Sequence, residues 1–410
     1  MVNKKQLSFS LKQGTLPNAW VFIILVALGT SPDIFLNQSD DRNIFLILVM
    51  LISPLVLLFS RKISKVDLIL ITFICGQFFS AIVINPEFLR WSTLFYTSLF
   101  AVMFLAYEHC LARDFFSILS YLNTLKLIML AFFWVLVTQQ ISVFFGLPVL
   151  LAGNYNPEYP WKLSSLAAEP SHAALTLSLL MFSYSKIKNS LLKKNQTFYE
   201  SVSSDKAIWL AYFWFCLTSN STSALFLMII LLTQFMRVRS IPSVLFISFF
   251  LSIGLLYSEG VAIDRATSFF FGLITLSPDA MLAADHSGSL RFVPAIVIFD
   301  KVSIFGLNGL FGHGIDYVTT FLYLEIPGIE EDFATGGIML VWLEYGFVAF
   351  LLFIFFSIQA TGIRFEIVTL ALWFIFLFLG NGINTQLVWL LIVIFHTNNF
   401  FLGKKFKAST

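Results

Sequence analysis

The chain has 410 residues, of which 58% are hydrophobic and 12% charged, and its mean hydropathy is +0.86. These values exclude a soluble globular protein and indicate a membrane protein with several spans. The formal net charge of +2 says little about partners, and we expect no nucleic acid among them.

The apolar runs predict an all-α, polytopic membrane protein with about 12 transmembrane helices. A bilayer core about 30 Å thick needs about 17–25 apolar residues per helix, and helices satisfy their own backbone there. We expect one integral membrane domain over residues 1–410, with a first span that is retained and not cleaved as a signal peptide. The predicted spans are residues 20–36, 43–59, 67–84, 89–106, 125–146, 172–185, 207–218, 223–236, 241–258, 336–358, 365–380 and 385–402.

Lysine and arginine are sorted between alternate loops, which predicts the orientation of the spans. By the positive-inside rule, the basic segments and both termini are cytoplasmic. The six remaining cations fall on the outer face and are exceptions to be explained. The cytoplasmic set holds 19 of the 25: Lys4, Lys5, Lys12, Arg61, Lys62, Lys65, Arg113, Lys126, Lys186, Lys188, Lys193, Lys194, Lys206, Arg237, Arg239, Arg364, Lys404, Lys405 and Lys407.

Residues 206–236 can be read either as one long helix or as a hairpin broken at 218–223. A single helix would invert the C-terminal half and move Arg364 and the C-terminal lysines outside, against the charge rule. We therefore predict the hairpin.

This topology leaves two long outer segments, residues 146–171 and 259–335, the second forming one large periplasmic loop. An amphipathic stretch at 261–282 is expected to lie in the interface or to form a short outer helix. Function is expected in these segments, because binding and catalytic residues concentrate on loops held by a scaffold.

Glu169 stands before Pro170 at the outer start of the sixth predicted span, and His172 follows three residues later on the same helix face. A carboxylate and a proline at this position are typical of an ordinary helix start. A carboxylate beside an imidazole is also typical of a general base with an orienting partner. The spacing alone leaves both interpretations open.

Three outer cations are candidate anion ligands. Arg291 opens a predicted amphipathic outer helix at 291–300, and a guanidinium fork binds phosphate or carboxylate in bidentate fashion. A surface arginine that contacts lipid phosphate is the alternative. The same two readings apply to Arg265 and Lys162.

A glycine-rich segment at 306–316 predicts a tight loop that could accommodate a ligand, with His313 between two glycines. A lone loop histidine is more often a plain surface residue than a catalyst. The three cysteines are isolated and show no metal-ligand spacing. The predicted spans are almost free of ionisable groups, Glu344 being the clear candidate, and this counts against an ion-coupled carrier.

Four short motifs follow one another between about residues 146 and 360. They are Glu169-Pro170-Ser171; residues 217–225, Leu-Thr-Ser-Asn-Ser-Thr-Ser-Ala-Leu; Arg291 followed by Gly306 and Gly312-x-Gly314; and Gly336-Gly337 leading into Leu343-Glu344-Tyr345-Gly346. In this order they resemble the O-antigen polymerase (Wzy-type) and O-antigen ligase superfamily of bacterial polysaccharide enzymes. Asn220 stands where the family often has arginine. Ala334 and Thr335 stand where ligases commonly have histidine, which favours a polymerase.

The resemblance implies a glycosyltransferase of the bacterial inner (cytoplasmic) membrane with its active site facing the periplasm. It would join oligosaccharide repeats linked to undecaprenyl diphosphate, in contact with membrane lipid and with a chain-length regulator protein as a possible partner. An O-antigen ligase and a lipid-linked oligosaccharide flippase are the alternatives.

The implied roles divide the candidate residues into three groups. Glu169, His172 or His313 would be the base, and Arg291, helped by Arg265 or Lys162, would hold the diphosphate. Tyr159 and Trp161 would stack on sugar rings. We expect no metal and no other cofactor.

Overall fold

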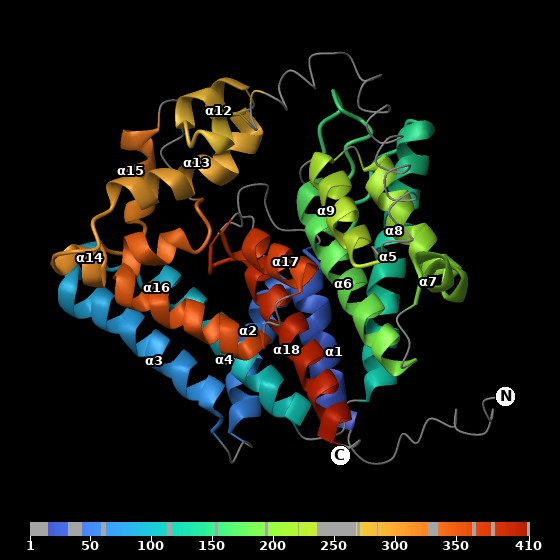
Figure 1. Cartoon of the computed structure of the whole chain (residues 1–410), viewed down its shortest axis with the longest axis horizontal. Coiled ribbons are helices and arrows are strands. Elements are labelled where there is room, and N and C mark those ends of the chain that lie inside the picture. Colours follow the sequence, from blue (N-terminus) through green and yellow to red (C-terminus); the bar gives the residue numbers. More distant parts are fainter. Residues whose placement is uncertain are drawn as a thin grey trace.

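The computed structural model describes residues 15–31, 43–58, 63–112, 117–151, 155–192, 196–219, 221–235, 268, 271–284, 286–326, 335–362, 366–378 and 382–407. Within these ranges all regular elements are helices, in agreement with the predicted all-α class (Figure 1). They are α1 (Thr15–Gly29), α2 (Ile44–Leu57), α3 (Lys65–Phe79) with a π-helical extension (Ser80–Ile84), a 3-10 turn (Pro86–Phe88), α4 (Trp91–Ala112), α5 (Ile118–Phe144), α6 (Pro170–Leu191), α7 (Phe198–Ser204), α8 (Lys206–Thr218), α9 (Thr222–Thr233), α12 (Pro278–Ala284), α13 (His286–Lys301), α14 (Leu307–Phe311), α15 (Tyr317–Glu325), α16 (Met339–Thr361), α17 (Ile367–Phe378) and α18 (Gln386–Lys407).

Each predicted span coincides with one of these helices, except the ninth, at 241–258, which lies outside the described residues. Five helices are long and apolar enough to cross a membrane: Lys65–Ile84, Trp91–Ala112, Ile118–Phe144, Met339–Thr361 and Gln386–Gly403. The protein is therefore an all-α, membrane-embedded protein in its described part.

Several predicted span boundaries differ from the helices: α1 begins at Thr15 and ends at Gly29, before the predicted end at 36, and α4 continues to Ala112, past the predicted end at 106. The fifth helix begins at Ile118 and not at 125, because the Ser117 side chain caps it by accepting a hydrogen bond from the Ser120 N–H. Lys126 therefore lies two turns inside α5. The sixth helix runs on to Leu191, because its basic end continues the helix beyond the apolar part.

The predicted break at 218–223 is present. The helix α8 ends at Thr218 and α9 begins at Thr222, and both helices pack against α6 and against each other. At 13 and 12 residues they are as short as the apolar pattern predicted.

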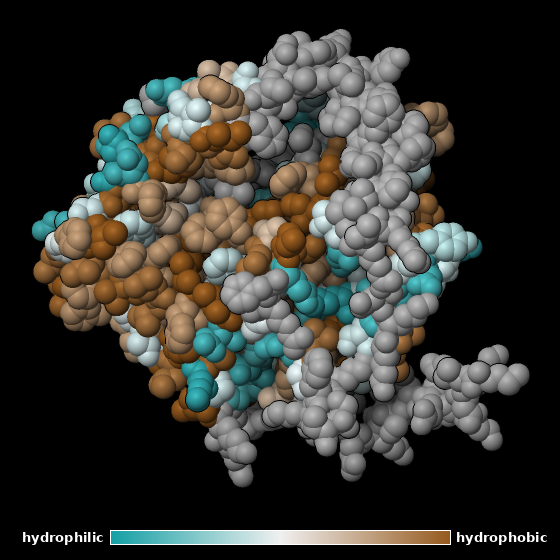
Figure 2. Space-filling model, viewed as in Figure 1, coloured by the Kyte–Doolittle hydropathy of each residue, from teal (hydrophilic) through white to brown (hydrophobic). Residues whose placement is uncertain are grey.

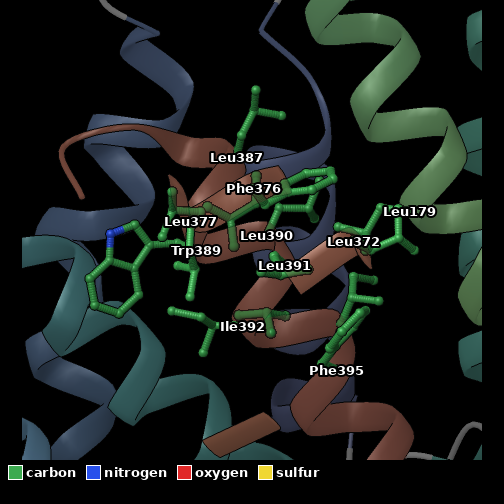
Figure 3. Packing of buried hydrophobic residues seen from close by; sticks show 14 of the residues in the cluster. Leu179, Leu372, Phe376, Leu377, Leu387, Trp389, Leu390, Leu391, Ile392 and Phe395 are labelled. Carbon is green, nitrogen blue, oxygen red and sulfur yellow. The ribbon is translucent and has the colours of Figure 1, made fainter. Parts of the chain in front are cut away.

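The core is centred on α18, which lies between two groups of helices (Figure 1). It packs against α4 and α16 on one side and against α6 on the other. The consecutive residues Trp389, Leu390, Leu391 and Ile392 are fully buried, so this turn of the helix is apolar around its whole circumference. Figure 3 shows Leu372 of α17 and Leu179 of α6 next to each other on one side of these residues, with Trp389 pointing to the other side.

Hydroxyl groups link the buried helices through short hydrogen bonds. The Tyr107 hydroxyl of α4 and the Thr397 hydroxyl of α18 are 2.5 Å apart. The Ser183 hydroxyl of α6 donates to the Asn398 side-chain oxygen at 2.6 Å and lies 2.8 Å from the Tyr121 hydroxyl. These contacts fix the rotation of α18 against its neighbours.

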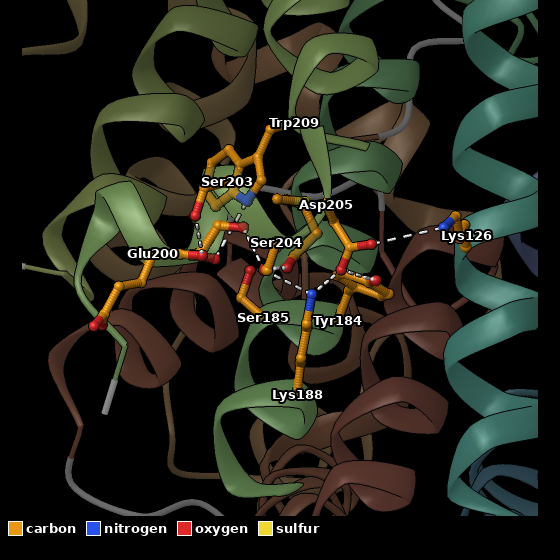
Figure 4. Close-up of polar contacts among 11 residues, drawn as sticks. Lys126, Tyr184, Ser185, Lys188, Glu200, Ser203, Ser204, Asp205 and Trp209 are labelled. Atoms are coloured by element: carbon orange, nitrogen blue, oxygen red, sulfur yellow. Dashed lines mark hydrogen bonds and ion pairs between the residues drawn. The ribbon is translucent and has the colours of Figure 1, made fainter. Parts of the chain in front are cut away.

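A polar cluster around Asp205 ties α5, α6, α7 and α8 together (Figure 4). The Asp205 carboxylate accepts a hydrogen bond from the Tyr184 hydroxyl at 2.6 Å and forms an ion pair with Lys188. Lys126 reaches the other carboxylate oxygen at 3.7 Å, and Lys188 also donates to the Ser204 hydroxyl at 2.8 Å. Two of the basic residues predicted on one side of the membrane, Lys126 and Lys188, thus meet in one cluster.

The outward faces of the apolar helices carry large exposed hydrophobic side chains, as a lipid-facing surface requires. Figure 2 shows hydrophobic side chains over the face of α3, α14 and α16, with hydrophilic ones gathered at its upper-left and lower margins. Examples from four helices are Leu51, Leu55, Leu127, Trp134, Leu210, Leu217, Leu351 and Phe355.

Candidate functional site

The segment before α6, which is predicted to lie on the outer face, is anchored to the bundle by Gln139 of α5. The Gln139 side-chain oxygen accepts a hydrogen bond from the Ser165 N–H at 2.9 Å, and its amide donates to the Leu150 carbonyl at 2.8 Å. The Ser31 N–H donates to the Leu166 carbonyl at 2.8 Å, which adds a contact to the end of α1. These bonds hold the chain in place just before Glu169.

Glu169 occupies the N-cap position of α6, with extended backbone (φ −135°) and with Pro170 as the first helical residue. Its side chain makes no capping hydrogen bond. The carboxylate is exposed and instead accepts a hydrogen bond from the Ser171 hydroxyl at 3.1 Å. His172 follows, half-buried, in the same turn. The carboxylate is therefore available to a ligand.

The preceding turn presents a cation and two aromatic rings. The Lys162 N–H donates to the Tyr159 carbonyl at 2.9 Å, which closes the turn. The Tyr159 side chain is 60% exposed and that of Trp161 is 48% exposed. Lys162 is also exposed and forms no ion pair with any described residue. The turn thus offers the groups that bind a sugar phosphate.

Trp161 also lines an open groove of about 450 Å³ between α5 and α8. The Gln140 amide donates to the Thr218 hydroxyl at 2.8 Å, and the Trp214 N–H donates to the Gln140 oxygen at 3.0 Å. Because these polar groups satisfy one another, the groove presents a mainly apolar wall. The remaining lining residues are Val137, Ile141, Phe144 and Phe145.

The structure does not place His313 beside Glu169. His313 lies between α14 and α15, where its ring stacks on Tyr317 with centroids 5.0 Å apart. The His313 backbone N–H donates to the Leu343 carbonyl of α16 at 2.9 Å. In Figure 1, α14 lies at the left margin, while α6 is in the right half. Glu169 and His172 thus share one element, and His313 belongs to another region.

A second polar cluster joins the long segment predicted at 259–335 to the helix bundle. The Arg90 guanidinium contacts the Asp316 carboxylate at 2.7 Å, and the Thr93 hydroxyl donates to the same carboxylate at 3.3 Å. The Asp316 N–H donates to the Glu344 carboxylate at 3.1 Å, and Glu344 is only 4% exposed. Sequence analysis identified Glu344 but missed Arg90 and Asp316. The charge pattern could have identified Arg90, because it is one of the six cations predicted on the outer face.

The remaining candidates are only partly described. Arg265 lies outside the described residues, as does most of the amphipathic stretch at 261–282. Arg291 lies in α13, which contains the predicted outer helix at 291–300, but its side chain is outside the described part. The glycine-rich segment is a loop around the short helix α14.

The described helices carry further ionisable groups besides Glu344, most of them near helix ends. Asp67 is 2% exposed, and Glu108, His109 and His396 lie within α4 and α18. Hydropathy did not identify Glu108 and His109 because α4 extends past the predicted end of its span. It did not identify His396 because one histidine hardly lowers the mean hydropathy of a long apolar run. Among the described residues, no three His, Cys, Asp or Glu side chains converge to hold a metal ion.

No family model, curated protein or solved structure matches the chain.

Proposed function

We propose that the chain is a polymerase of lipid-linked oligosaccharide repeats, acting on undecaprenyl-diphosphate-linked substrates at the periplasmic face of a bacterial inner membrane. The observation that carries the proposal is the exposed Glu169 carboxylate, which stands at a helix start without capping the helix. The order of the four motifs and the sorting of the basic residues support the same function.

The proposed reaction assigns roles to Glu169, to the groups near it and to Arg291. The Glu169 carboxylate takes the proton of an acceptor hydroxyl, whose oxygen attacks the anomeric carbon of the donor sugar. The bond from that carbon to the diphosphate breaks, and Lys162 with Arg291 stabilises the charge of the leaving group. Tyr159 and Trp161 stack on sugar rings of the substrate. His172 orients the base.

The groove beside Trp161 fits a substrate with a long hydrocarbon tail. Its wall is apolar, and it opens on the surface of α5 and α8, where Leu217 is exposed. A lipid chain in this groove would leave its diphosphate near the level of the turn that carries Lys162. The groove therefore supports a lipid-linked substrate.

Substitution of Glu169 by glutamine tests the proposal. A helix-end charge is worth about 0.3–2 kcal/mol, so loss of that role alone leaves a folded and active protein. General-base catalysis contributes about 10²–10⁴-fold, so we expect Glu169→Gln to abolish polymer on a gel of surface glycan while the protein still accumulates in the membrane. Glu158→Gln, an exposed acid on the same outer segment, is the matched control. Abundant polymer from Glu169→Gln would exclude Glu169 as the base.

A carrier is the second candidate, because Asp67, Glu108 and His396 place ionisable groups inside the helix bundle. Deletion of the gene separates the candidates. Single-repeat glycan indicates a polymerase, unattached lipid-linked polymer indicates a ligase, and absence of surface glycan indicates a flippase.

A further inference from the structure

The loop that contains α14 lies alongside α16 and not beyond its end. The helix α16 is long and apolar enough to cross a membrane. The His313 N–H donates to the Leu343 carbonyl at 2.9 Å, and a Cβ atom on Gly346 would meet the Leu310 carbonyl. Because a helix rises about 1.5 Å per residue, Gly346 lies about 10 Å along the axis from Met339, the first residue of α16. The helix α14 therefore lies within the length of this span.

The same loop lies within the length of α3 and its π-helical extension, a second helix long enough to cross a membrane. The Ser80 hydroxyl at the start of the extension donates to the Phe311 carbonyl, and the Asn85 side-chain amide donates to the Gly312 carbonyl at 3.1 Å. The Phe79 and Phe311 rings meet edge to face with centroids 5.6 Å apart. Two spans thus place α14 at the same depth (Figure 1).

The side of this loop that faces away from the bundle is apolar. The Phe305 side chain is 85% exposed, that of Leu307 62% and that of Leu310 40%. No Asp, Glu, Lys or Arg occurs between Lys301 and Asp316. Figure 2 shows the hydrophobic surface continuing over α3, α14 and α16. A continuous apolar surface of this kind is typical of an interaction with a membrane or a protein.

The backbone of the loop is satisfied in part by the chain itself. The Leu310 N–H donates to the Gly306 carbonyl at 3.1 Å, and the Phe305 N–H donates to the Ser303 hydroxyl at 3.1 Å. The hydrocarbon core excludes irregular backbone whose polar groups lack partners. At the boundary between headgroups and acyl chains, water still reaches the backbone while apolar side chains are buried in lipid. The loop fits that boundary.

We propose that residues 303–311 form a membrane-inserted turn of the long segment predicted outside the membrane, and that lipid acyl chains cover its apolar side. The lipid surface of α3 and α16 continues over α14, so the same lipid contacts Phe305 and Leu307. Lys301 and Asp316, the charged residues on either side of the turn, lie at the level of the headgroups. The turn divides the long segment into two parts, independently of the proposed function.

Hydroxyl-radical footprinting of the wild-type full chain in phospholipid nanodiscs tests the proposal without any substitution. The radicals modify aromatic rings that water reaches. We expect Phe305 to be protected, whereas Tyr159 and Tyr199, which are 60% and 80% exposed, are modified. Modification of Phe305 to the same extent as Tyr159, after correction for the reactivity of each ring, overturns the proposal.

Spin labels distinguish lipid from a protein surface as the cover of the turn. The labels are attached to single cysteines, in a chain whose three native cysteines are replaced. We expect labels at Phe305→Cys and Leu307→Cys to collide with oxygen more often than with a water-soluble nickel chelate, as at the lipid-facing control Leu351→Cys. The exposed control Glu158→Cys should show the reverse order.

Two results of the spin-label experiment overturn the proposal. Labels at 305 and 307 that behave like the label at 158 would lie in water. Labels that collide with neither reagent would be covered by protein, such as a second copy of the chain. Neither method depends on polymer formation, so failure of this proposal is distinguishable from failure of the proposed function.

Discussion

Gly312 and Gly346 allow the backbone of the outer loop to pack directly against α16. Their φ angles are +87° and +89°, and Gly346 interrupts the helical geometry of α16. A Cβ atom on Gly312 would lie well under 3.0 Å from the Glu344 backbone, and one on Gly346 equally close to Leu310. The contact therefore depends on two glycines that lie far apart in the sequence.

Gly312→Ala is expected to destabilise the protein more than Gly306→Ala does. Gly306 has nearly the same φ, +89°, but a Cβ atom there meets nothing within 4 Å. Both substitutions incur about 1–3 kcal/mol because these φ and ψ angles are essentially restricted to glycine, and only Gly312→Ala adds a steric cost of roughly 1–3 kcal/mol. Melting temperatures in detergent measure the difference. Equal effects of the two substitutions would show that the close approach is unimportant.

Glu344 is expected to stabilise the outer loop through its oxygen and not through its charge. Glu344→Gln keeps an acceptor for the Asp316 N–H, whereas Glu344→Ala leaves that donor unpaired at a cost of about 1–3 kcal/mol. Glu344→Gln should therefore melt close to the wild type, and Glu344→Ala well below it. A strong loss of stability in both variants would contradict this role. Loss of polymer in a stable Glu344→Gln protein would assign Glu344 to the chemistry.

At the scale of the elements, α5 positions the outer turn that carries the candidate site. Gln139→Ala removes the acceptor of the Ser165 N–H and the donor to the Leu150 carbonyl. We expect faster proteolysis within residues 155–169 and a loss of about 1–3 kcal/mol, because buried backbone groups lose their partners. Thr138→Val is the control, since the exposed Thr138 hydroxyl bonds only to its own helix. Unchanged proteolysis in Gln139→Ala would contradict the anchoring role.

Helix positions were predictable from the sequence because each apolar run must bury its own backbone in lipid. The broken segment at 218–223 was predictable from charge parity alone. Helix ends were less predictable, since the Ser117 cap and the basic end of α6 extend helices beyond their apolar part. The contacts of Arg90 with Asp316 and of Asp67 with His109 depend on how distant helices pack, which no local pattern encodes.

At the scale of the whole molecule, residues predicted on one side of the membrane lie together. Lys126, Lys188 and Asp205 meet in one cluster, and Arg90 meets Asp316 at the other ends of the helices. In Figure 1, α12 and α13 lie at the upper edge, opposite the C-terminal end of α18 at the lower edge. The candidate site before α6 also lies at the end of α6 that is opposite its basic end.

Reporter fusions test this sidedness directly. We expect fusions after Lys194 and after Lys407 to report the cytoplasm, and insertions near Asn156 and Glu330 to report the outside, because the basic segments remain on the cytoplasmic side. Insertions that keep the complete chain are preferable to truncations, since downstream spans contribute charges that fix the orientation. A C-terminal fusion that reports the outside would require one span fewer. An insertion near Asn156 that reports the cytoplasm would move the Glu169 carboxylate to the opposite side and would exclude a periplasmic polymerase site at Glu169.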